Sequence, residues 1–207
     1  MERISRKAAE ARVLDLDGRE HPLRSLWASR AAVLLFVRHF GCREQAVRLY
    51  REKGTIRALG AELVIIGNTV PCFARAFRED LAITTPIYVD PSMASYRLLD
   101  IRRLREALLS GGALKHKLSA LCGGFREART KRDRSQLGGV LVVRQDGAVV
   151  YRHISEGADD HPAIEEILAA LATEITRIAS SGRAARSRRS HARCGRARRR
   201  GACARCR

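Results

Sequence analysis

A cysteine at the junction of an apolar run and an amphipathic segment is the residue best placed to do chemistry. Cys42 follows seven apolar residues at 31–37, which predict a strand buried on both faces. It precedes apolar positions at Ala46, Leu49 and Tyr50, spaced as on one face of a helix. The first turn of a helix has unpaired N–H groups and partial positive charge, which stabilise a thiolate. We therefore predict that Cys42 is a reactive cysteine.

Basic side chains next to Cys42 favour the same chemistry. Arg38 and His39 precede it, and Arg43 follows it. Positive charge lowers the pKa of a nearby thiol from about 8.5, and the thiolate is the nucleophile. The alternative is that Cys42 is an inert small apolar residue beside a strand. The flanking bases and the strand-to-helix junction favour the reactive interpretation.

A second cysteine is expected at the same end of the sheet. Residues 62–66 predict another buried strand, parallel to the first through a right-handed crossover, and Pro71 is suited to the first position of a helix. Cys72 then lies in the first turn of that helix, at the carboxyl edge where open α/β sheets place their sites. The pair could act as attacking and resolving cysteines. Alternatively, Cys72 is only a small residue at a helix start, because a disulfide needs Cα atoms within about 7 Å.

The order of the remaining elements predicts the fold class. Apolar runs alternate with amphipathic segments, and an Asp-Gly pair at 146–147 indicates a hairpin between the last two strands. We expect an α/β fold. The expected strands are 13–18 at an edge, 31–37, 62–66, 87–89, 140–143 and 148–151. The expected helical segments are 23–27, the one after Cys42, the one led by Pro71 with Phe73, Phe77 and Leu81 inside, 92–100, and a long one after Pro162.

Two segments hold the positive charge of the chain. The net charge is +18, of which residues 101–135 contribute +7 and residues 182–207 contribute +11. We predict that 101–135 forms a basic helical insert of two short helices, with its basic face solvated or meeting an anionic partner. The tail 182–207 has eleven arginines, no acid and no large apolar residue, which predicts disorder. The expected organisation is a domain at 1–181, with the insert inside it, followed by the tail.

The tail allows three interpretations. It can make a weak, salt-dependent nucleic-acid contact through phosphates. Its H-x2-C and C-x2-C pairs have the spacing of a small zinc site, but an arginine-rich connection offers no core to hold one. It can also be an arginine-biased extension without a role in the domain. We expect no cofactor and no metal; the residues of the disfavoured zinc site would be His191, Cys194, Cys203 and Cys206.

The sequence favours a cytoplasmic location without a membrane partner. The opening residues MERISRKAAEAR lack the apolar core of a signal peptide, and no stretch reaches the roughly 18 apolar residues of a membrane span. In the cytosol the six cysteines are expected to be reduced at rest, so a disulfide there is more often catalytic than structural.

A succession of short motifs resembles the peroxiredoxin-like branch of the AhpC/TSA (alkyl hydroperoxide reductase/thiol-specific antioxidant) superfamily. The motifs are RHFGC followed by REQ, IGN before a Pro-led helix ending ARAFRED, IYVD, QLGGVLVV, a DG hairpin and DDHPAIEEILAAL, and they extend over about residues 10–173. The resemblance implies a thioredoxin-like α/β fold with a central mixed sheet, helices on both faces, and a redox-active cysteine at the start of the first long helix. It also implies an antioxidant oxidoreductase that reduces a peroxide with a thioredoxin-like or small-thiol reductant.

That resemblance assigns a role to each candidate residue. Cys42 as thiolate would attack the peroxide oxygen and become a sulfenic acid. Arg38 or Arg43 would stabilise the anion, and His39 would hydrogen-bond to it or act as a spacer. Cys72, or an external thiol, would then form the disulfide that a reductant opens by exchange.

The sequence departs from the branch at the motif itself. Members usually have C-x-x-C between FG and RE, whereas this chain has Gly41-Cys42-Arg43, as if three residues and one cysteine were missing. Three residues are close to one helical turn of about 3.6, so the helix can keep its inner face. The P-x-x-x-T-x-x-C motif of typical peroxiredoxins is also absent. The alternative function is therefore a non-catalytic thioredoxin-like binding or regulatory module, tethered to nucleic acid by its basic tail.

Overall fold

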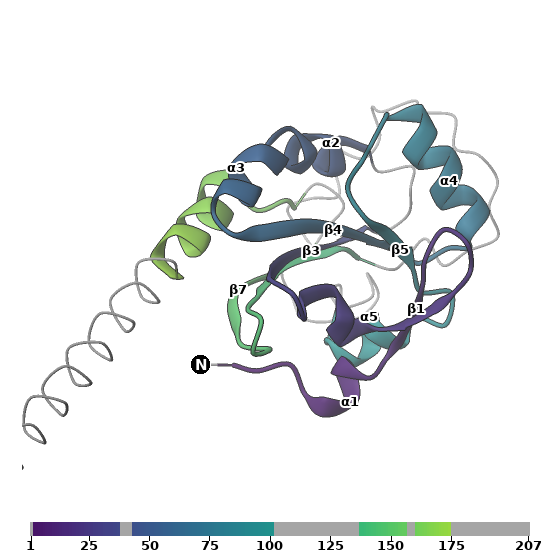
Figure 1. Cartoon of the computed structure of the whole chain (residues 1–207), viewed down its shortest axis with the longest axis horizontal. Coiled ribbons are helices and arrows are strands. Elements are labelled where there is room, and N and C mark those ends of the chain that lie inside the picture. The colour runs from purple at the N-terminus through teal and green to yellow at the C-terminus, as the bar shows by residue number, and fades with distance from the viewer. Residues whose placement is uncertain (1, 38–42, 102–136, 157–159, 175–207) are drawn as a thin grey trace, which may run out of the picture. The chain divides into compact units, whose positions relative to one another are not determined.

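The structure is a computed structural model that describes residues 2–37, 43–101, 137–156 and 160–174 (Figure 1). The chain separates into two compact units, residues 1–171 and 172–207, and the fold below is that of the first. The tail 182–207 and all of the basic insert except Ile101 lie outside the described residues, and the organisation expected for them stays a prediction. None of the described helices is long and apolar enough to cross a bilayer.

Seven strands form one mixed sheet, which confirms the expected α/β class. The order across the sheet is β2-β1-β5-β4-β3-β6-β7. The three central strands β3, β4 and β5 are parallel, whereas β1, β6 and β7 join their neighbours in antiparallel fashion. The strands are β1 (Arg12–Leu14), β2 (Glu20–Pro22), β3 (Ala31–Val37), β4 (Ala61–Gly67), β5 (Ile87–Val89), β6 (Gly139–Val143) and β7 (Val149–Ile154).

Helices cover both faces of the sheet, as expected. Figure 1 shows α2, α3 and α4 on one side of β3 and β4, and α1 and α5 on the other. Each layer packs on its own hydrophobic core, and helical residues 164–171 join the first layer. The helices are α1 (Arg6–Ala9), the 3₁₀ helix η1 (Leu23–Trp27), α2 (Arg43–Arg51), α3 (Lys53–Ala58), α4 (Pro71–Asp80) and α5 (Ala94–Leu98).

The central strand β3 is apolar throughout because each of its faces contacts a core. Every residue of β3 after Ala31 is buried. Val33 and Leu35 belong to the core under α2 and α4, whereas Leu34 and Phe36 belong to the core under α5. Side chains alternate between the two faces of a strand, so a strand covered on both faces needs a continuous apolar run.

The sheet begins with a hairpin of β1 and β2, of which the sequence predicted only the first strand. Residues 13–18 were expected to form the edge strand, but β1 is the second strand and β2, expected as a loop, lies at the edge. The Asp15 carboxylate accepts hydrogen bonds from the N–H groups of Asp17 and Arg19, both at 2.9 Å. Gly18 completes the turn with a φ of 81°. The hydrogen bonds of the Asp15 side chain thus stabilise a turn after which β2 pairs with β1.

The inner face of α4 is also shifted by one residue from its expected position. Ala74 and Phe77 are buried, whereas Phe73 is 44% exposed. Ala74 and Phe77, three residues apart, form the buried face, and Phe73, which directly precedes Ala74, lies at the margin of that face.

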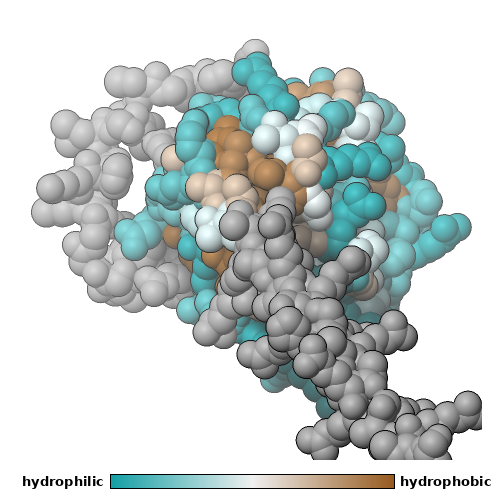
Figure 2. Space-filling view, turned by 60° about the vertical axis from the view of Figure 1, so that its left-hand side comes forward, coloured by the Kyte–Doolittle hydropathy of each residue, from teal (hydrophilic) through white to brown (hydrophobic). Residues whose placement is uncertain are grey.

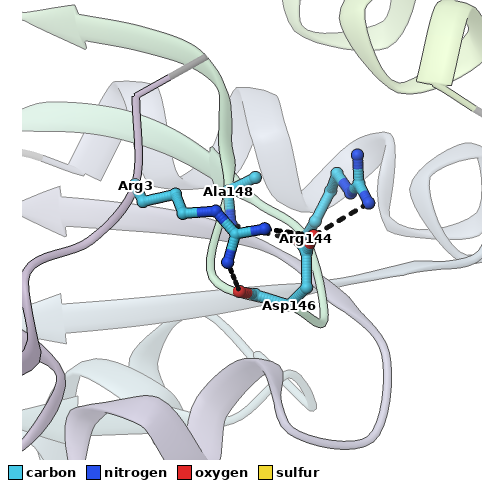
Figure 3. Close-up of polar contacts among 4 residues, drawn as sticks. All are labelled: Arg3, Arg144, Asp146 and Ala148. Atoms are coloured by element: carbon cyan, nitrogen blue, oxygen red, sulfur yellow. Dashed lines mark hydrogen bonds and ion pairs between the residues drawn. The ribbon is translucent and has the colours of Figure 1, made fainter.

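The N-terminal segment is attached to the β6–β7 turn. Figure 3 shows the Asp146 carboxylate between two guanidinium groups, Arg3 at 3.1 Å and Arg144 at 2.9 Å. Arg3 forms an antiparallel bridge with Ala148, next to the hydrogen bond from Val149 N–H to the carbonyl of Glu2. The first residues of the chain therefore cover part of the outer edge of the sheet.

One face of the molecule combines apolar and polar surface. Figure 2 shows a patch of hydrophobic residues framed by hydrophilic ones. Partly buried side chains that pack on the first core include Leu59, Ile164 and Leu168. A folded protein commonly exposes such apolar atoms, so the patch alone does not indicate a function.

The two-sided burial of β3 gives a stability prediction. We expect Phe36→Ala to lower the free energy of unfolding by about 3 to 5 kcal/mol, because it leaves a cavity in a closed core. The same substitution at Phe73 should cost less than about 1 kcal/mol, because that ring is already partly solvated. Urea unfolding of both variants measures the difference. Equal losses would contradict the burial of Phe36.

Candidate active site

Two strand ends form the framework of the predicted site. β3 ends at Val37, which pairs with Gly67 at the end of the parallel strand β4. From these adjacent ends the chain continues to α2 through residues 38–42 and to α4 through residues 68–70. Arg38, His39 and Cys42 lie outside the described residues, so their roles stay predictions. The structure describes the groups that hold the two strand ends and the two helices.

A buried hydroxyl connects the two strand ends. The Tyr96 side chain on α5 is fully buried, and its O–H donates toward the carbonyl oxygens of Val37 at 2.8 Å and Ile66 at 2.9 Å. Burial raises the pKa of Tyr96 well above its ordinary value, and the charge of Asp90 adds to this rise. The hydroxyl therefore stays protonated and keeps its donor role. Its ring also packs edge-on against Phe36, with the centroids 5.1 Å apart.

Asp90 fixes the helix that carries Tyr96. Its fully buried carboxylate accepts hydrogen bonds from Ser95 N–H at 2.7 Å, Ser95 O–H at 2.6 Å and Ser92 O–H at 2.6 Å. Its own N–H donates to the carbonyl of Gly67 at 2.7 Å. Asp90 therefore links the end of β4 to the start of α5. The sequence prediction treated Asp90 only as the end of a strand, and the serines two and five residues after it were the local signal for these hydrogen bonds.

Arg43 connects the start of α2 to the far end of α4. Its Nη2 lies 2.5 Å from Oδ2 of Asp80, the last residue of α4, and both side chains are about half exposed. Cys72 is eight residues earlier on α4, about 12 Å away at 1.5 Å per residue. Of the predicted site residues, the structure thus describes Arg43 and Cys72. The Arg43 guanidinium contacts the last residue of α4, whereas Cys72 lies in the first turn of that helix.

Cys72 is an accessible thiol in the first turn of α4. It follows Pro71, the first residue of the helix, as the sequence predicts. The side chain is exposed, and the cysteine is free. An exposed thiol at this position can meet an external reductant without a change in the fold.

A polar cluster that sequence reasoning missed holds the end of α2. Tyr50 Oη accepts hydrogen bonds from Lys53 Nζ at 2.7 Å and from Thr84 N–H at 3.1 Å, and it donates to the carbonyl of Ala82 at 3.1 Å. The Lys53 ammonium, followed by the contacts of Thr84, lowers the pKa of Tyr50 to about 8. The cluster fixes α2 to the segment after α4. A tyrosine and a lysine three residues apart in the sequence were the only local signal for this cluster.

The described residues offer no obvious metal centre. Among them, no group of three or more His, Cys, Asp or Glu side chains could hold a metal ion.

Comparison with known proteins identifies the family. The profile described as AhpC/TSA antioxidant enzyme matches residues 48–157. The chloroplastic thioredoxin-like protein AAED1 of Arabidopsis thaliana is 34% identical over 177 residues, covering 77% of this chain and 69% of that protein. The chain belongs to the AhpC/TSA antioxidant enzyme family. Peroxiredoxin-like 2C of Mus musculus is 28% identical to this AhpC/TSA protein over 179 residues. The alignment covers 80% of this chain and 79% of the mouse protein.

Solved structures confirm the thioredoxin-like peroxiredoxin fold of this AhpC/TSA protein. Peroxidoxin BcpB from Mycobacterium tuberculosis superposes with a TM-score of 0.59 at 16% identity, over 84% of this chain and 98% of that one. A peroxiredoxin Q of Xanthomonas campestris superposes with a TM-score of 0.56 at 13% identity, over 82% of this chain and 94% of that one. At such low identity these matches show the fold alone. The family profile and the Arabidopsis relative confirm the family resemblance predicted from the order of motifs, and the cytoplasmic location stays a prediction.

The Tyr96 hydroxyl gives a stability prediction. We expect Tyr96→Phe to lower the free energy of unfolding by about 1 to 3 kcal/mol, because two buried carbonyls lose their donor. Tyr88→Phe serves as a control on a half-buried ring, and we expect it to cost less than about 0.5 kcal/mol. Urea unfolding measures both. A Tyr96→Phe variant as stable as wild type would show that the hydrogen bonds from Tyr96 to the two carbonyls do not contribute to stability.

The Tyr50 cluster gives a pH prediction. The phenolate absorbance of wild type minus that of Tyr50→Phe should rise with a midpoint near pH 8. Lys53→Met should move this midpoint toward the ordinary value of about 10, because it removes the largest cause of the lowered pKa.

The same shift has a consequence for stability. The folded-state pKa of Tyr50 is the lower one, so its stabilising contribution is complete above about pH 10 and is lost as the pH falls through about 8. Denaturant unfolding of wild type and Tyr50→Phe between these values measures it. A midpoint that Lys53→Met leaves unchanged would contradict the assigned cause.

Proposed function

We propose that this protein is a thiol-based antioxidant oxidoreductase of peroxiredoxin type, which reduces a peroxide through Cys42. The observation that carries the proposal is the place of this cysteine in a member of the AhpC/TSA family. Cys42 directly precedes Arg43, the first residue of the nine-residue helix α2. The first turn of a helix stabilises a thiolate, and the thiolate is the form that attacks a peroxide.

The proposed reaction has three steps. The Cys42 thiolate attacks one peroxide oxygen, so that an S–O bond forms and the O–O bond breaks. Sulfur is oxidised to a sulfenic acid, and the other oxygen leaves as alkoxide or hydroxide and takes a proton from water. A second thiol then displaces water from the sulfenic acid and forms a disulfide. A thioredoxin-like protein or a small thiol reduces this disulfide by exchange.

The basic residues have different proposed roles. The charge of Arg43 is partly offset by Asp80, 2.5 Å away. We therefore assign stabilisation of the anion first to Arg38 and to the N–H groups at the start of α2, and only second to Arg43. His39 is a hydrogen-bond partner of the reacting oxygen or a spacer. The exposed Cys72 is the resolving thiol, and an external thiol is the alternative.

One sequence observation favours a second function. The single cysteine in Gly41-Cys42-Arg43 replaces the C-x-x-C of the branch, as in a module that has lost its chemistry. Such a binding or regulatory module would use the arginine-rich tail 182–207 for a salt-dependent nucleic-acid contact. It predicts no peroxide-dependent change at Cys42 and a nucleic-acid affinity that is lost when the tail is removed.

The test is the oxidation of the full-length reduced chain by one equivalent of hydrogen peroxide or an organic hydroperoxide. Peptide mapping by mass spectrometry follows Cys42 and uses the exposed Cys72 as an internal reference. We expect Cys42 to oxidise about tenfold faster than Cys72, or more, because only Cys42 has flanking basic residues. Cys42→Ser should abolish turnover, whereas Cys72→Ser should leave the first oxidation step unchanged.

The products separate the remaining possibilities. A Cys42–Cys72 bridge identifies Cys72 as the resolving thiol, and a mixed disulfide with added small thiol identifies an external one. If Cys42 oxidises no faster than Cys72, the catalytic proposal is wrong and the binding module is the better description.

A further inference from the structure

A surface pocket lies between the turn that follows β1 and the helix α4. Its volume is about 490 Å³, and Figure 1 shows the turn beside this helix. The turn contributes Leu16 and Asp17 to the lining, α4 contributes Arg75 and Arg78, and the segment 82–84 completes the wall. A pocket of this volume, with apolar surface and a few charged groups, suits a small ligand.

Two guanidinium groups one helical turn apart make the α4 wall of the pocket basic. Nη2 of Arg75 lies 3.6 Å from Oδ1 of Asp17, and both side chains are more than half exposed. Such an exposed ion pair is weak, so an anionic ligand can replace Asp17. Arg78 is exposed and forms no ion pair with any residue that the structure describes. One free and one weakly paired guanidinium together suit a ligand with carboxylates.

The other charged groups of the pocket narrow the class of ligand. Glu79 is exposed on the same wall and has no ion-pair partner in the described part of the chain. Its carboxylate disfavours a polyanion and favours a ligand that carries an ammonium group beside its carboxylates. At the other end, the Lys53 ammonium donates to Thr84 Oγ1 at 3.0 Å. The pocket therefore fits a small molecule of amino-acid or peptide type.

The exposed face of α4 connects the pocket to a thiol. Cys72 is exposed and free, and Arg75 and Glu79 follow it by three and seven residues, which places all three on one face of the helix. At 1.5 Å per residue, Arg75 lies about 4.5 Å and Arg78 about 9 Å from Cys72 along the helix axis. A small molecule can span this distance. Its thiol can thus reach Cys72 while its carboxylates contact the guanidinium groups.

We propose that this pocket binds a small thiol that carries carboxylates and directs it to a disulfide of Cys72. The thiolate of the ligand attacks the Cys72 sulfur, so that a new S–S bond forms and the old one breaks, and the displaced sulfur leaves as a thiolate and takes a proton from water. A second molecule of the thiol attacks the mixed disulfide in the same way and releases Cys72 as a thiol. This inference rests on the proposed function, in which Cys72 forms the disulfide, and it names the class of the external reductant.

The experiment measures thiol–disulfide exchange at Cys72 in the full-length chain and needs no peroxide. Dithiodipyridine first converts Cys72 into a mixed disulfide with a neutral leaving group. Mass spectrometry of the Cys72 peptide then follows its reduction by glutathione and mercaptosuccinate, which carry carboxylates, and by mercaptoethanol, which is neutral. We expect Arg78→Gln to slow the two anionic thiols about threefold to tenfold and mercaptoethanol less than about twofold, because it removes a charge that holds a carboxylate.

Further variants separate the pocket from the general charge of the chain. Arg57→Gln removes an exposed arginine of α3 that does not line the pocket, and it should change each rate less than about twofold. Asp17→Asn should accelerate the two anionic thiols about twofold or more, because it frees Arg75. S-methylglutathione, which has the carboxylates but no thiol, should slow the reaction of glutathione with wild type and not that with Arg78→Gln.

The outcomes distinguish this inference from the proposed function. A loss confined to the anionic thiols in Arg78→Gln supports the pocket. Equal rates in Arg78→Gln and wild type, or the same loss in Arg57→Gln, overturn the pocket and leave the peroxidase function standing. If Cys42 fails to react with peroxide while the preference for anionic thiols persists, the peroxidase function is wrong and the pocket remains a site of thiol exchange.

Discussion

The hydrogen bonds of one buried hydroxyl hold together the carboxyl ends of the two central strands, β3 and β4. Tyr96 reaches from α5 to the carbonyls of Val37 and Ile66, where two parallel strands end side by side. At the end of a sheet the ladder stops, and the last carbonyls need donors from elsewhere. A tyrosine can supply one from within an apolar layer because its ring packs on Phe36 while its O–H meets the carbonyls.

The two helices that follow these strand ends are positioned by surface contacts as well as by the core. Arg43 joins the start of α2 to the end of α4, and the Tyr50 cluster joins the end of α2 to residues 82–84. Exposed ion pairs of this kind add little stability. Their value lies in orientation, because two contacts at opposite ends of a short helix restrict its rotation and tilt.

The inner side of α2 combines close packing with an unpaired polar group. Ala46 and Leu49 are embedded in the core, whereas the Nε2 of Gln45 beside them is buried and has no hydrogen-bond partner among the residues that the structure describes. A buried amide N–H without a partner costs free energy, so an apolar side chain at this position would give the more stable packing.

The sequence by itself determined the class of the fold and the order of its central strands. The apolar runs at 31–37 and 62–66 predicted the two central strands, and Asp146-Gly147 predicted the last hairpin, because these patterns report burial and turn geometry locally. The succession of motifs also identified the family.

The tertiary structure alone decided which distant groups meet. The link from Tyr96 to Val37 spans 59 positions, the pair of Arg43 with Asp80 spans 37, and Tyr50 meets Thr84 across 34. Local patterns contain no record of such pairs, since they depend on how whole helices pack on the sheet. The same limit explains why Phe73 is exposed at the margin of the inner face of α4, and why β2 and not β1 is the edge strand. Periodicity establishes that an element has an inner face, and packing decides which residues form it.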